Sequence, residues 1–142
     1  MSTTQRNGAT LVAVTPSLGA ILRHHTLGVL ERHHHAFNEV HERTPEELMM
    51  MAEIFGDAVA ILDTIGWSPD PEAKAETINV SITDAHLTQL REQRADLGMT
   101  VLDYLDIRAD IDTTAELAEV DEFINRYHRE SSDLLTLIRA CH

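Results

Sequence analysis

Cysteine is nearly absent from this sequence: Cys141 is the only one among 142 residues. A single cysteine excludes a disulfide within the chain. No run of apolar residues approaches the about 20 that a membrane-spanning helix needs. The opening residues, MSTTQRNG, also lack the basic and then apolar order of a secretory signal. We therefore expect a cytoplasmic protein without a membrane-spanning segment.

Positive charge is also scarce. The chain has 11 lysines and arginines but 24 acidic residues, which gives a formal net charge of −13. A surface of that sign repels the phosphates of nucleic acids and of anionic membranes. We therefore expect neither nucleic acid nor membrane as a partner. A protein with a basic surface fits the charge better, although the same charge also keeps an ordinary protein soluble.

The motifs of several enzyme classes are missing. The six glycines are too scattered for a phosphate-binding loop, and no Walker, Gly-x-Gly-x-x-Gly or zinc-finger spacing occurs. Cys141 has His142 beside it, but two residues at a chain end are expected to fray and do not hold a base in place. The sequence leaves open whether the protein is an enzyme.

Helical patterning is what the sequence does contain. With 43% apolar and 25% charged residues, 1–142 fits a single domain. Thr15, followed by a proline, predicts the start of a helix over about 16–42. Thr44 and a second proline begin another helix, which Gly66 ends.

The second half of the chain has a similar order of elements. Residues 67–76 contain two prolines and are predicted to be a linker between two helical hairpins. Alternation and β-branched residues predict a strand over 77–82. Thr83 then caps a third helix, and Thr114 begins a fourth. A corresponding strand over 11–14 precedes the first helix.

Matching positions suggest an internal repeat: Leu22 and Leu90 lie 68 positions apart, and Phe55 and Ile124 lie 69 apart. Helices of similar length also share such spacing by chance. Two amphipathic helical hairpins hide their apolar stripes best by closing face to face. We therefore predict an all-α fold, a four-helix bundle made of two helical hairpins, with a minor two-stranded β ribbon and a flexible segment over 1–9.

Five of the nine histidines lie in one stretch, RHHTLGVLERHHHAFNEV, residues 23–40. At about 100° per residue, His25 and His33 share the apolar side of the first helix, whereas His24 and His35 lie on the opposite side. We expect the histidines of the outer side to be solvated and to contact glutamates one turn away.

A metal site is an alternative use of these histidines. The candidate ligands are Glu31, His33 and His34, because Glu31 and His34 have the Glu-x-x-His spacing of di-iron bundles. A second such pair is missing, and the second predicted helix has no histidine. Imidazole suits nickel and zinc, so we favour adventitious binding of a divalent metal over a built site. The sequence suggests no other cofactor.

Several polar residues fall on otherwise apolar stripes, where burial without partners is costly. Counted outward from the turns between helices, Asp57 comes level with His33, and Arg94 comes level with Tyr127 and Ser131. Such a polar layer fixes the register of the helices through hydrogen bonds, or it forms a ligand-binding pocket. Its candidate residues are His25, His33, Asp57, Arg94, Tyr127 and Ser131.

The second predicted helix is apolar over more than half of its circumference, with an additional stripe of Met50, Ile54 and Ile61. This predicts burial on both sides, and hence a homodimer. Two functions remain open. One is a protein-interaction module that self-associates or engages a basic protein; the other is a small-ligand or divalent-metal site in the polar layer, with or without catalysis. We prefer the first.

Overall fold

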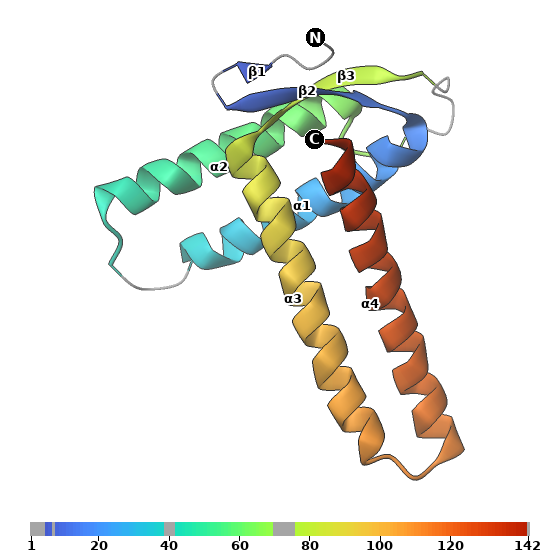
Figure 1. The fold of residues 1–142 in the computed structure, drawn as a ribbon. Coiled ribbons are helices and arrows are strands. Elements are labelled where there is room, and N and C mark those ends of the chain that lie inside the picture. The colour runs from blue at the N-terminus through green and yellow to red at the C-terminus, as the bar shows by residue number, and fades with distance from the viewer. Residues whose placement is uncertain (1–4, 7, 39–41, 70–75, 142) are drawn as a thin grey trace.

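The computed structural model describes residues 5–6, 8–38, 42–69 and 76–141 (Figure 1). The described elements are, in order, β1 (Gln5–Arg6), β2 (Ala9–Val14), α1 (Pro16–Asn38), α2 (Pro45–Ile65), β3 (Ile78–Thr83), α3 (Asp84–Ala109) and α4 (Thr114–Ala140). Helix dominates and the sheet is small, which confirms the predicted class. None of the helices in the described residues is long and apolar enough to cross a membrane.

Threonine caps begin the helices where the sequence predicts them. The Thr44 hydroxyl accepts a hydrogen bond from the backbone N–H of Glu47 at 3.1 Å, and the Thr83 hydroxyl accepts one from His86 at 3.1 Å. Each bond satisfies a backbone donor that the first turn leaves open. Gly66 ends α2 with a φ of 94°, a value that favours glycine. Helix α1 extends to residue 38, and 39–41 of the predicted span lie outside the described residues.

The sheet is antiparallel, with the order β1-β2-β3. Strands β2 and β3 pair with Val12 opposite Val80, which confirms the predicted ribbon. Strand β1 adds a third strand from within the segment 1–9 that we expected to be flexible. One face of the sheet lies on the core, since Val12 and Val80 are buried whereas Leu11 is half exposed. Of the predicted linker 67–76, residues 70–75 lie outside the described part of the chain.

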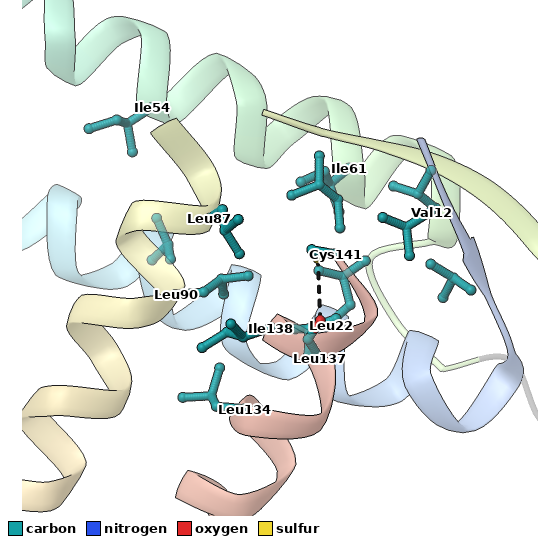
Figure 2. Close-up of a cluster of buried hydrophobic side chains, with 14 residues drawn as sticks. Val12, Leu22, Ile54, Ile61, Leu87, Leu90, Leu134, Leu137, Ile138 and Cys141 are labelled. Atoms are coloured by element: carbon teal, nitrogen blue, oxygen red, sulfur yellow. Dashed lines mark hydrogen bonds between the residues drawn. The ribbon is translucent and has the colours of Figure 1, made fainter. Parts of the chain in front are cut away.

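Buried apolar side chains from all four helices and from β2 and β3 form one core cluster (Figure 2). Leu22 of α1, Ile61 of α2, Leu90 of α3 and Leu137 of α4 all belong to it. The cluster lies where the two hairpins meet beneath the sheet. Burial of such side chains stabilises the fold by roughly 2 kcal/mol each.

Cys141, at the end of α4, lies inside this core. Its thiol donates a hydrogen bond to the backbone oxygen of Leu137 at 3.3 Å (Figure 2). Burial raises the pKa of the Cys141 thiol to about 11. The expectation that this residue frays is therefore wrong, because the last turn of α4 is part of the apolar cluster. A thiol held in this protonated state is not an activated nucleophile.

The two hairpins cross, and each extends beyond the crossing as an arm (Figure 1). We call residues 30–38 and 45–56 the α1–α2 arm, and residues 95–131 the α3–α4 arm. The four helices therefore do not run side by side along one axis, and face-to-face closure is confined to the crossing. The buried residues of α3 lie in its first two turns, ending at Leu90. The order strand, helix, helix occurs twice, but the internal repeat stays a prediction.

Candidate functional site

A polar contact line connects α1 and α3 at the crossing. His86, Gln89 and Gln93 are spaced so that they lie on one side of α3, and each of them bonds to α1. The bonds are Thr26 Oγ1 with His86 Nε2 at 3.2 Å, His33 Nε2 donating to Gln89 Oε1 at 2.8 Å, and Gln93 Nε2 donating to the backbone oxygen of His25 at 3.2 Å. We call this set the α1–α3 polar seam.

His86 is the most enclosed member of the seam, with 0% of its surface exposed. Burial lowers the pKa of its imidazole from 6.5 to about 4, and the nearby carboxylate of Asp57 opposes this shift. The ring is therefore neutral in the folded protein at pH 7. Its Nδ1 atom is buried without a hydrogen-bond partner. An unpartnered buried nitrogen costs stability, and we assign it no ligand.

The histidines of α1 face the directions that their spacing predicts. His25 is buried and His33 is half buried, whereas His24 and His35 are exposed. Burial, followed by the neighbouring His24, lowers the pKa of His25. His33 keeps one ring nitrogen, Nδ1, buried and without a partner.

The predicted pairing of His33 with Asp57 does not form. His33 bonds to Gln89, and the Asp57 carboxylate instead accepts a hydrogen bond from the Thr83 hydroxyl at 2.7 Å. The reason is the crossing, because α3 passes beside α1 and brings Gln89 to His33 (Figure 1). Asp57 therefore supports the cap of α3, since the same Thr83 hydroxyl accepts from the backbone N–H of His86.

Arg94, Ser131 and Tyr127 are only partly brought together. Arg94 Nε donates to the backbone oxygen of Ser131 at 3.3 Å, as their common level predicts. Tyr127 instead stacks on Tyr104, with ring centroids 5.8 Å apart, and lies near Phe123 at 6.5 Å. The six candidate ligand residues are thus divided among several local contacts, and they do not converge on one pocket.

The three candidate metal ligands also separate. Glu31 lies 4.0 Å from the exposed His35, and His33 bonds to Gln89. His34 lines a groove on the α1–α2 arm. Within the described residues, no group of three or more histidine, cysteine, aspartate and glutamate side chains is arranged to hold a metal ion.

A surface pocket of about 440 Å³ lies between α1 and the α3–α4 hairpin. Its charged walls pair with one another: His24 Nε2 is 3.2 Å from Glu130, and Arg32 is 3.0 Å from Asp96. These pairs lie at the surface, where each contributes little to stability. The pocket is therefore an open hollow between α1 and the α3–α4 hairpin, and several of its polar side chains already pair within the chain.

An apolar groove of about 440 Å³ separates the two helices of the α1–α2 arm. Leu48, Met51 and Phe55 of α2 line it on one side, and His33 and His34 of α1 line it on the other. Leu48 and Phe55 are both more than one-third exposed. The groove thus presents apolar surface to solvent along the arm.

Sequence reasoning missed the polar side of α3, although a signal was present. His86, Gln89 and Gln93 have the same three- and four-residue spacing as the apolar stripe beside them, and such a polar stripe indicates a second contact face. No protein-family model matches the chain, and no curated protein or solved structure is significantly similar to it.

Proposed function

We propose that this protein is a protein-interaction module that forms a homodimer through its α1–α2 arm. The supporting observation is the first half of α2, where several large apolar side chains are exposed. Leu48, Met49, Met50 and Phe55 are all more than one-third exposed, and Met49 reaches 73%. Single exposed apolar residues are ordinary, but several large ones that adjoin on one helix are typical of an interaction surface.

The groove of the arm supplies a receptor for these side chains. In a two-fold dimer the same patch is used on both subunits, so a side chain of each protomer enters the groove of the other. Met49 and Met50 suit this role, because methionine is flexible and adapts to irregular apolar surfaces. The groove, lined by Leu48, Met51 and Phe55, then becomes part of a shared core.

Light scattering during size exclusion tests the proposal. We expect the wild-type protein to have the mass of two chains, and a variant with Met49→Glu and Phe55→Glu to have the mass of one. Two carboxylates placed in an apolar interface weaken dimerisation by at least about a hundredfold. The matched control is Leu11→Glu, because Leu11 is 50% exposed and lies on the sheet, away from the arm.

The proposal fails if the wild-type protein has the mass of one chain at every concentration, or if the double variant dimerises as the control does. The small-ligand or metal-site hypothesis, with or without catalysis, comes second. Asp57 and Arg94, two of its central residues, already have partners within the chain.

A further inference from the structure

The outer side of α3 carries an apolar stripe that is separate from the α1–α2 arm. Side chains at three- and four-residue spacing share one side of a helix. In the α3–α4 arm, the exposed residues on this side are Ala95, Gly98, Leu102, Leu105 and Ala109, and we call them the α3 stripe. Leu102 is 58% exposed and Leu105 is 45% exposed.

Helix α4 does not cover this stripe, because it packs on a different side of α3. Tyr104 stacks on Phe123 with centroids 5.5 Å apart, and Arg108 pairs with Asp121 at 2.6 Å. At about 100° per residue, Tyr104 lies about 160° and Arg108 about 120° around the helix from Leu102. The stripe is therefore exposed even though the arm is closed by its own internal contacts.

The charge around the stripe is strongly negative. Residues 99–122 contain eight acidic side chains and one basic one, Arg108, and Arg108 is already paired. Asp103 and Asp106 flank the stripe on the exposed surface of α3. A second copy of this arm carries the same charge, so repulsion opposes its docking here.

We propose that the α3 stripe binds an amphipathic helix with a basic flank, supplied by another protein. An apolar helix face docks through side chains at positions i, i+3, i+4 and i+7, which the stripe matches. Lysine or arginine beside those anchors then pairs with Asp103 and Asp106. Gly98 has no side chain, so a partner helix can come close to the backbone there. The space beside it is open, since a Cβ placed at Gly98 meets no atom within 4 Å.

The length and end of the stripe define the partner further. From Ala95 to Ala109 the helix rises about 21 Å, which accommodates about four turns of a partner helix. A hollow of about 490 Å³ lies at the end of the stripe nearest the crossing. Its lining includes Ala95, Gly98, Leu135 and the two arginines Arg91 and Arg94. We expect a bulky apolar anchor to enter this hollow, with the basic residues of the partner at the opposite end, near Asp103.

Fluorescence anisotropy of the full chain with a labelled peptide tests this inference. The probe is a helix of about 18 leucines and lysines in amphipathic order, compared with a scrambled peptide of the same composition and with a version that has glutamate for lysine. We expect the amphipathic lysine peptide to bind with a Kd on the order of micromolar, and more tightly than both controls. Raising the salt from about 50 to about 300 mM should weaken it.

Variants separate the apolar and the charged contributions. Leu102→Ser with Leu105→Ser should weaken binding at least about tenfold, and Asp103→Asn with Asp106→Asn should remove most of the salt dependence. Met49→Ser with Phe55→Ser is the matched control on the other arm and should leave binding unchanged. Circular dichroism checks that each variant keeps its helices.

Equal binding of the scrambled peptide, tighter binding of the glutamate peptide, or unchanged binding by the Leu102/Leu105 variant would overturn the inference. So would a loss of dimer mass in that variant, which would mean that a second copy occupies the stripe. The inference does not depend on the dimer through α2. Light scattering on the same samples reports that dimer separately, so either proposal can fail alone.

Discussion

The two arms leave apolar surface exposed in different ways. The α3–α4 arm closes on itself through the ring stack of Tyr104, Phe123 and Tyr127 and through the pair of Arg108 with Asp121, and its exposed leucines face outward. In the α1–α2 arm, the two helices flank an open apolar groove. The first arm is complete as a structure, whereas the second leaves the inner side of its own hairpin open.

The two arms therefore differ in whether their apolar contacts are complete without a bound partner. A hairpin that is closed by its own contacts can present an outer surface to a partner and keep its shape without that partner. A hairpin with an open groove gains buried apolar area when a second protein fills the groove. The head of the molecule, where the hairpins cross beneath the sheet, then carries most of the folding energy for both arms.

The largest expected effect tests this division along a single helix. Leu90 is 0% exposed at the crossing, and Leu102 is 58% exposed three turns farther along α3. We expect Leu90→Ala to lower the free energy of unfolding by about 2–5 kcal/mol. Leu102→Ala should change it by less than about 0.5 kcal/mol. Urea denaturation at one protein concentration measures both, and similar losses would show that the arms share the stability of the head.

A smaller effect should come from the protonation of His86. The unfolded chain binds this proton near the ordinary pKa of 6.5, whereas the folded chain binds it only near a pKa of about 4. Below pH 6.5 the unfolded state therefore holds more protons, and stability falls as the pH drops. Between about pH 7 and about pH 5 the loss attributable to His86 is about 2 kcal/mol.

Urea denaturation across this pH range measures that loss, with His86→Leu as the test variant and His35→Gln as the control. The first variant should flatten the pH profile, because the buried imidazole is gone. The second should retain the wild-type profile, since His35 is exposed. A profile that is equally steep in His86→Leu would mean that other groups cause the loss.

Local signals explain which parts of the fold the sequence predicted. Thr44, Thr83 and Gly66 act within one helical turn, so their effect does not depend on tertiary structure. The match of Arg94 with Ser131 was also predictable, because a short turn joins two long helices whose lengths can be counted outward from it. The alternation of β3 likewise predicted a strand with one buried face.

The crossing of the hairpins was not predictable in the same way. An amphipathic stripe indicates which side chains are buried but not which element covers them. Counting from the turn placed His33 beside Asp57 because it assumed that α1 and α2 are each other's main neighbours. Helix α3 instead passes beside α1 and offers Gln89 to His33. The sequence pattern thus left open which helix lies beside α1, and hydrogen bonds between segments far apart in the sequence fix that arrangement.

The smallest expected effect concerns the closure of the α3–α4 arm. Tyr104 is the central ring of the stack, with planes inclined by 13° to Phe123 and by 19° to Tyr127. Tyr104→Leu keeps an apolar side chain but removes the ring contacts, which contribute about 1 kcal/mol beyond the buried area. We expect a small decrease in Tm and faster amide hydrogen exchange at the tip of this arm only. Met99→Leu, which alters an exposed side chain of α3 outside the stack, should change neither. If exchange instead accelerates in the α1–α2 arm, the two arms are coupled through the head and their independence is wrong.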